Sequence, residues 1–207
     1  MANMITSLRF MLLFLLVAMI YLAPAPWQLL DPVLLILIIA LDGVDGYVAR
    51  RRGESTLFGS VYDIAVDRIV ESTLWIVLAD VGLVPLWVAL VFITRGVLVD
   101  SIRGQAAAHG VGAFEMMRSP LGRFLVAGRL MRGVYGVVKA IAFGWILLFQ
   151  PVAALWPGWW GEWAGPVQAV TAALVYIGVA LCLVRGVPVV VEFYLAAGQP
   201  HKARVTR

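Results

Sequence analysis

The sequence predicts an all-α integral membrane protein with six transmembrane helices and both termini in the cytoplasm. Composition is the first reason for this prediction. Of the 207 residues, 62% are hydrophobic and only 14% are charged, and the mean hydropathy is +0.94, which is outside the range of soluble globular proteins. We therefore expect a single domain, residues 1–207, built from membrane-spanning segments.

The second reason is the number of apolar runs that are long enough to cross a membrane. A hydrocarbon core is spanned by about 20 apolar residues in a helix, and a helix is required because no water is present there to satisfy the backbone. Six such runs are bounded by polar or Pro/Gly-rich residues: about 5–22, 29–48, 60–79, 84–103, 126–149 and 166–187. Each run is predicted to form one transmembrane helix.

The third reason is the placement of lysine and arginine, because short loops rich in these residues stay in the cytoplasm. Basic residues follow the second, fourth and sixth runs: Arg50, Arg51 and Arg52, then Arg118 and Arg123, then Lys202, Arg204 and Arg207. The other three connections contain none. This alternation places both termini in the cytoplasm. It also accounts for the formal charge of +4, so we expect no nucleic-acid partner.

Four aspartates are placed near the cytoplasmic ends of the second and third predicted helices. Asp42 and Asp45 are three residues apart, and Asp63 and Asp67 are four apart, so each pair projects from one helical face. The short connection makes the two helices antiparallel neighbours, and the four carboxylates then meet at one depth. Arginine could balance their charge, but an all-oxygen cluster without His or Cys favours Mg²⁺ or Mn²⁺, and we expect two ions.

Small residues lie on the same helical faces as the acids. Gly46 comes four residues after Asp42, Ala49 is three further on, and Gly59 precedes Asp63 by four. A flat or phosphate-bearing molecule could approach the backbone there. The alternative is that these small residues serve only to pack two membrane helices closely.

The combined spacing resembles the complete signature of the CDP-alcohol phosphotransferase family. The matching residues are Asp42-x-x-Asp45-Gly46-x-x-Ala49-Arg50, then eight residues, then Gly59-x-x-x-Asp63-x-x-x-Asp67. Members of that family are six-helix membrane enzymes that move a phosphoalcohol group from a CDP-linked donor to an acceptor hydroxyl and release CMP. The resemblance implies the same fold and activity here, and a homodimer.

The resemblance also implies roles for individual residues. Asp42, Asp45 and Asp63 would hold the metal ions, and Asp67 would contribute to the metal site and act as the general base. The CDP donor would lie against Gly46, Ala49, Arg50 and Gly59. The opening "NMITSLRF" is similar to the N-x-I-T-x-x-R opening of bacterial phosphatidylglycerophosphate synthases, which adds Asn3 and Thr6 to the donor side.

Basic residues recur at membrane depth further along the chain, where they need anions. Arg95 lies on the fourth predicted helix, and Arg129, Arg132 and Lys139 lie on one stripe of the fifth. We expect these four residues to bind the phosphate of a small, water-soluble acceptor, next to a lipid donor whose tails enter from the bilayer. The alternative is that the basic side chains reach out to anionic lipid headgroups.

The leading hypothesis is a transferase of the inner (cytoplasmic) membrane that moves a phosphatidyl group from CDP-diacylglycerol to glycerol 3-phosphate, with its active site facing the cytoplasm. Two departures from the phosphatidylglycerophosphate synthases bear on the acceptor: Gly96 follows Arg95 where an acid is usual, and Arg129 and Arg132 replace a Lys-x-Lys pattern. Inositol phosphate, serine and phosphatidylglycerol, the acceptor of cardiolipin synthases, are therefore alternatives.

A divalent-cation channel or carrier is the alternative from a different class, since its acids would line a pore. Here the four aspartates occupy one end of the predicted helices, and the outer halves of the helices are almost uncharged. This distribution argues against a conduction path.

Overall fold

The structure, a computed structural model, describes the backbone of residues 2–52, 57–108 and 119–197. Side chains are described over the same ranges except at residues 2–3, 45–52, 57, 60, 108, 121 and 196–197. The long helices are α1 (Ala2–Leu22), α3 (Asp31–Arg52), α4 (Leu57–Asp80), α5 (Leu86–Ala108), α7 (Arg129–Phe149) and α9 (Pro157–Ala197). The short segments are α2 (Ala25–Gln28), α6 (Pro120–Gly122), the π-helical turn η1 (Arg123–Ala127) and α8 (Val152–Leu155). No strand occurs within these ranges.

The helix boundaries follow from proline and glycine. The α1 helix ends at Leu22, just before Pro24, and α2 begins directly after that proline. At the end of α4, Gly82 has a φ of 76°, and the amide groups of Gly82 and Leu83 donate to the carbonyl oxygens of Ala79 and Leu78. This is a Schellman cap, in which a left-handed glycine lets the chain leave the helix while satisfying its last carbonyl groups.

Each of the six predicted runs corresponds to one long helix, although the runs 29–48, 84–103 and 126–149 begin two or three residues before α3, α5 and α7. The α9 helix extends well beyond the predicted 166–187. It comprises 41 residues, which corresponds to about 60 Å of helix, twice the thickness of a hydrocarbon core. The Trp/Gly/Pro-rich segment before residue 166 was expected to be a connection. It is helical, and its Pro157 occupies the first position, where a missing N–H group costs nothing.

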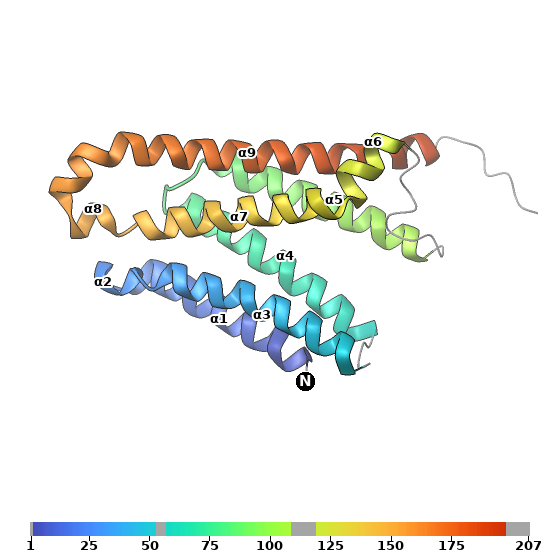
Figure 1. The fold of residues 1–207 in the computed structure, drawn as a ribbon, viewed down its shortest axis with the longest axis horizontal. Coiled ribbons are helices and arrows are strands. Elements are labelled where there is room, and N and C mark those ends of the chain that lie inside the picture. The colour runs from blue at the N-terminus through green and yellow to red at the C-terminus, as the bar shows by residue number, and fades with distance from the viewer. Residues whose placement is uncertain (1, 53–56, 109–118, 198–207) are drawn as a thin grey trace, which may run out of the picture.

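The long helices are arranged in two groups with α4 between them (Figure 1). The α5, α7 and α9 helices form one group, in which α9 packs on both α5 and α7. The α1 and α3 helices form the other group. Helix α4 contacts α1 on one side and α5 on the other, and α3 contacts α7. The short α2 and α8 helices lie at the same end of the molecule (Figure 1).

An aromatic cluster holds α4, α5 and α7 together. Trp75 is completely buried; its ring stacks on Phe92 at 4.4 Å between centroids and contacts Phe143 at 4.6 Å. Leu78 and Leu147 are also fully buried in the same cluster. This core fixes the position of α4, whose preceding turns carry the acidic residues described below.

The molecule has the surface expected of a membrane protein. Large apolar side chains are exposed along α1, α3, α5, α7 and α9, which soluble monomers avoid. Four segments of the described chain are long and apolar enough to cross a membrane: Met4–Leu22, Ala25–Val44, Arg129–Leu155 and Pro157–Leu195. The α4 and α5 helices have similar lengths but carry the charged side chains of the candidate site.

Candidate active site

Three of the four predicted aspartates converge around one arginine. Asp42 comes from α3, and Asp63 and Asp67 project from one face of α4; one oxygen from each lies within 4.8 Å of the others. Arg9 reaches them from α1. Its Nη1 is 2.7 Å from an oxygen of Asp42 and 3.0 Å from one of Asp63, and its Nη2 is 2.6 Å from Asp67.

The chemistry of this acidic triad, Asp42, Asp63 and Asp67, fits a divalent metal ion. All donors are carboxylate oxygens, which hard cations such as Mg²⁺ prefer, and the three charges face the single charge of Arg9. The arginine is buried while the acids are close to half exposed, so the open side of the triad remains accessible to a ligand. The fourth predicted ligand is Asp45, whose side chain lies outside the described residues.

A second charged cluster lies one turn further along α4. Arg68 donates to both oxygens of Asp100 on α5 and, at 3.0 Å, to Oε2 of Glu71. The other oxygen of Glu71 lies 2.8 Å from Nζ of Lys139 on α7. These ion pairs connect α4 to α5 and to α7 at the depth of the site.

The ring of Tyr135 on α7 lies among three cations. Nζ of Lys139 is 4.3 Å from the ring centroid. The guanidinium carbons of Arg185 and Arg95 are 5.3 Å and 5.7 Å away. The hydroxyl group of Tyr135 donates to Oε1 of Glu71 at 3.4 Å. The tyrosine is 7% exposed, so these contacts are largely shielded from water.

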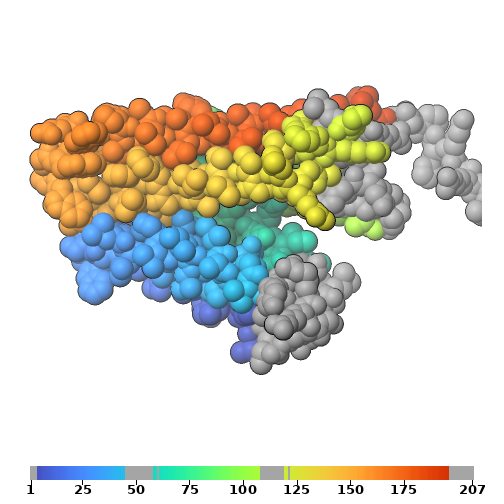
Figure 2. All heavy atoms as spheres, viewed as in Figure 1, coloured from blue at the N-terminus to red at the C-terminus, as the bar shows by residue number. Residues whose placement is uncertain are grey.

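One cavity of about 510 Å³ is lined by two members of the acidic triad, Asp42 and Asp67, and by the cations. Its charged and polar lining is formed by Arg9, Asp42, Asp67, Arg68, Glu71, Arg95, Arg103, Arg132, Tyr135, Lys139 and Arg185. Gly136, between Arg132 and Lys139 on α7, also lines it. Figure 2 shows the surface of α4, in teal, between those of α3 and α7, the helices that supply much of this lining.

Two of the lining arginines have unused hydrogen-bonding capacity. Neither Arg95 nor Arg185 forms an ion pair with a carboxylate among the described residues. Nε of Arg95 and both Nε and Nη1 of Arg185 are buried without a hydrogen-bond partner, while Nη2 of Arg185 donates weakly to a backbone carbonyl at 3.5 Å. Buried, unpaired cationic donors are costly, and an anionic ligand in the cavity would satisfy them.

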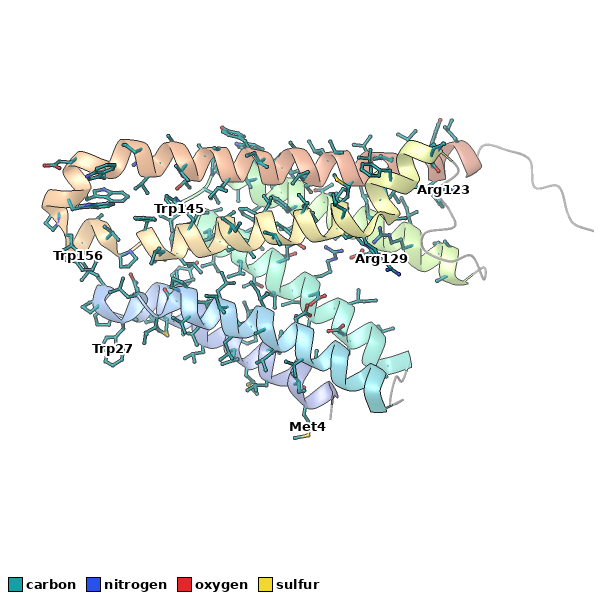
Figure 3. All side chains as sticks on the ribbon, viewed as in Figure 1. Met4, Trp27, Arg123, Arg129, Trp145 and Trp156 are labelled. Carbon is teal, nitrogen blue, oxygen red and sulfur yellow. The ribbon has the colours of Figure 1, made fainter. Side chains whose placement is uncertain are left out.

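The structure brings most of the predicted phosphate-binding residues to this cavity. Arg95, Arg132 and Lys139 all line it. Arg129, at the start of α7, is exposed and is not part of the lining. Figure 3 shows Arg129 and Arg123 toward one end of the molecule and Trp27, Trp145 and Trp156 toward the other.

The predicted donor-binding residues are only partly described. Thr6 is buried on α1, one turn before Arg9, and Gly59 is half-buried one turn before Asp63. The side chains of Asn3, Gly46, Ala49 and Arg50 lie outside the described residues.

Sequence reasoning did not assign site roles to Arg9, Glu71, Tyr135 or Arg185. A signal existed for three of them, and for Arg9 it is the arginine of the N-x-I-T-x-x-R opening. Glu71 continues the four-residue spacing of Asp63 and Asp67, and Tyr135 lies between Arg132 and Lys139 on their stripe of α7. Arg9 and Arg185 come from helices at opposite ends of the chain, so their arrival at the site depends on tertiary packing.

These features define an all-helical membrane protein in which a carboxylate cluster suited to divalent ions adjoins a cationic cavity suited to phosphate. A model of the CDP-alcohol phosphatidyltransferase family matches residues 1–197, and the chain belongs to this family.

Three similar proteins illustrate the acceptors that occur among relatives. The CDP-diacylglycerol–glycerol-3-phosphate 3-phosphatidyltransferase of Bacillus subtilis (strain 168) is 34% identical over 83 residues, which are 40% of this chain and 43% of the relative. An archaetidylinositol phosphate synthase of Aeropyrum pernix is 34% identical over 89 residues, 41% and 45% of the two chains. A Mycobacterium bovis protein, provisionally named a cardiolipin synthase, is 33% identical over 75 residues, 36% of each chain. The chain therefore matches less than half the length of each of these proteins.

Proposed function

We propose that the protein transfers a phosphatidyl group from CDP-diacylglycerol to glycerol 3-phosphate and releases CMP. The observation that carries this proposal is the cavity lined both by Asp42 and Asp67 of the acidic triad and by the cations. A transferase of this kind needs one region that grips a nucleotide diphosphate and another that holds the acceptor's phosphate, within reach of each other.

On the donor side, we assign Asp42, Asp45, Asp63 and Asp67 as ligands of two divalent ions, either Mg²⁺ or Mn²⁺. When bound, these ions would supply Lewis-acid stabilisation of the charge that develops on the pyrophosphate. Thr6 and Asn3 on α1, together with Gly46, Ala49, Arg50 and Gly59, would line the nucleotide site.

On the acceptor side, Asp67 is the general base. Its carboxylate takes the proton of the acceptor hydroxyl as the oxygen attacks the phosphatidyl phosphorus and the bond to CMP breaks. Asp67 suits this role because it lines the cavity together with the cations, whereas Asp63 is not part of the lining. Arg9 holds the triad together and thereby keeps Asp67 directed at the cavity.

The acceptor's phosphate would bind Arg95, Arg132, Lys139 and Arg185. Arg185 joins the residues predicted from sequence because its buried guanidinium donors lack partners. Arg129, exposed at the start of α7, would attract the acceptor's phosphate through its long-range charge. A phosphate monoester carries close to two negative charges at neutral pH and suits a cavity with this excess of cations.

A second acceptor, inositol phosphate, is favoured by one observation: the Aeropyrum relative is as similar to the chain as the Bacillus relative is. Both acceptors carry a phosphate monoester, so the cationic cavity suits either. Serine and phosphatidylglycerol lack this group. Each offers only one negative charge, from a carboxylate or a phosphodiester, and would offset fewer of the cations around Arg95 and Arg185.

We further propose that all six long helices cross the inner (cytoplasmic) membrane, that both termini are cytoplasmic and that the site faces the cytoplasm. The arginines at the end of α3, and Arg118 and Arg123 after α5 in the sequence, support this orientation. A homodimer, with contacts through the exposed apolar faces of α4 and α5, is consistent with the exposed side chains of Ile76 and Leu90.

CMP release by the purified protein tests the proposal. The protein, in detergent or nanodiscs, is supplied with CDP-diacylglycerol and one of four acceptors, or with no acceptor. The four are glycerol 3-phosphate, inositol phosphate, serine and phosphatidylglycerol. We expect CMP only with Mg²⁺ or Mn²⁺ and most rapidly with glycerol 3-phosphate. Equal rates with serine, or release that continues in EDTA, would contradict the assignment.

A further inference from the structure

The ring of Tyr135 lies between three positively charged side chains that repel one another. Lys139, Arg95 and Arg185 come from α7, α5 and α9, and all three approach the same buried ring. Like charges at this spacing repel one another, and burial strengthens the repulsion because screening by water is reduced. The repulsion would drive the two arginines apart unless something between the helices attracted them.

A carboxylate would hold the cations together but would also neutralise them. Glu71 does this for Lys139 and Arg68, whose ion pairs leave less charge for a ligand. The face of an aromatic ring attracts cations through its quadrupole and carries no net charge. A tyrosine at this position therefore gathers Arg95 and Arg185 while leaving their charge and their hydrogen-bond donors available to an anion.

The orientation of the Tyr135 ring is set by the hydrogen bond that its hydroxyl group makes. The hydroxyl group of Tyr135 donates to Glu71, and Glu71 is itself fixed by Arg68 and Lys139. Arg68 also donates to Asp100 on α5. Residues of α4 and α5 therefore fix the Glu71 carboxylate that orients the Tyr135 ring on α7. The network thus couples the position of the ring to three helices.

We propose that Tyr135 is a positioning residue that holds Arg95, Lys139 and Arg185 in the arrangement that binds a phosphate monoester. It acts through the negative face of its ring, and the hydroxyl group only sets the ring's direction. This inference rests on the proposed function in assuming that the acceptor carries a phosphate, but it concerns binding and is tested without the transfer reaction.

The sharpest test changes the electrostatics of the ring and leaves its shape almost unaltered. Tyr135 is replaced by Phe and by Phe analogues with one, two and three ring fluorines, which progressively weaken the negative face. The Kd values for inorganic phosphate and glycerol 3-phosphate are measured by titration calorimetry without CDP-diacylglycerol. We expect Tyr135→Phe to change these Kd values by about twofold or less, and the trifluorinated analogue to raise them about tenfold, the size of an ordinary buried cation–π interaction.

A purely structural role for Tyr135 would give a different pattern. In that case the fluorinated variants, whose volume is nearly unchanged, would bind phosphate as well as Tyr135→Phe does, and the inference would be overturned. It would also be overturned if Tyr135→Phe weakened binding as much as the trifluorinated analogue. Phe92→Leu is a matched control for loss of a buried aromatic ring, because Phe92 stacks on Trp75 and does not line the cavity of the cations; we expect it to lower Tm without changing the Kd for phosphate.

Turnover then separates this inference from the proposed function. The fluorinated variants are assayed with saturating CDP-diacylglycerol, and we expect the KM for glycerol 3-phosphate to rise with fluorination while the donor KM stays constant. Fluorine-dependent phosphate binding in a protein that transfers nothing to glycerol 3-phosphate would support the inference and contradict the proposed acceptor. A wild-type protein that binds neither probe would overturn both.

Discussion

Replacing Gly186 with alanine should displace Arg95 and weaken acceptor binding. A Cβ atom at Gly186 on α9 would lie 2.5 Å from Cγ and 3.0 Å from Nε of Arg95. Non-bonded carbon atoms pack at about 3.5–4.0 Å, so the arginine must move by roughly 1 Å or more. The close approach involves the middle of the side chain, and a new rotamer would carry the guanidinium away from Tyr135 and the cavity.

The size of the effect follows from the contact that is lost. A hydrogen bond to a charged group contributes about 1.5–3 kcal/mol. Loss of the Arg95 contact to phosphate should therefore raise the KM for glycerol 3-phosphate about ten- to hundredfold. The KM for CDP-diacylglycerol should change much less. Steady-state CMP release, with each substrate varied in turn, measures both constants.

The same helix provides a matched control. Gly178 lies eight residues earlier on α9 and is also buried, but a Cβ there would lie 3.6 Å from Cζ of Phe92, an ordinary contact. Both substitutions gain about 1 kcal/mol of helix propensity, so Gly178→Ala should retain wild-type kinetics. In an Arg95→Ala background, Gly186→Ala should have no additional effect on acceptor KM. An additional loss in that background, or an unchanged acceptor KM in the single variant, would refute the reasoning.

Three further predictions concern the acids and their partners. Asp67→Asn should lower kcat by about 10²- to 10⁴-fold through loss of the base while CDP-diacylglycerol binding persists at saturating Mg²⁺; full activity would exclude Asp67 as the base. Arg9→Gln leaves the three carboxylates without their shared guanidinium, so the Tm measured in EDTA should fall. Addition of Mg²⁺ should then raise the Tm of the variant more than that of the wild type. Equal increases in Tm for the two proteins would contradict this prediction. Arg132→Ala and Lys139→Ala should each raise the acceptor KM more than the donor KM, and an unchanged acceptor KM in kinetic assays would remove that residue from the cavity.

The helices and the acidic triad could be predicted from sequence because both depend on short-range spacing. Apolar run length determined where the long helices lie, and the three- and four-residue spacings placed acids on single helical faces. The extent of α9 could not be predicted in this way. Its first turns contain Pro157, glycines and tryptophans, a composition that also suits a loop, and only packing against α7 and α8 distinguishes the two.

The partners of the acids depend on contacts between distant parts of the chain. Arg9 is 54 residues from Asp63 in sequence, and no local pattern indicates that its guanidinium enters the triad. Arg50 and Arg68 are the arginines closest to the acids in sequence, but the side chain of Arg68 turns to Asp100 and Glu71. The position of Gly186 against Arg95 likewise depends on the packing of α5 on α9.

Metal binding by the acidic triad is the most direct test of the account. Mn²⁺ is titrated into the purified wild-type protein and into Asp42→Asn, Asp63→Asn and Asp67→Asn variants, in the presence of CDP, and the free ion is measured by electron paramagnetic resonance. The account predicts that the wild-type protein binds Mn²⁺ and that each folded variant binds it at least about tenfold more weakly, because each loses one charged oxygen ligand. Equal Mn²⁺ binding by all four proteins would contradict the assignment of the metal site.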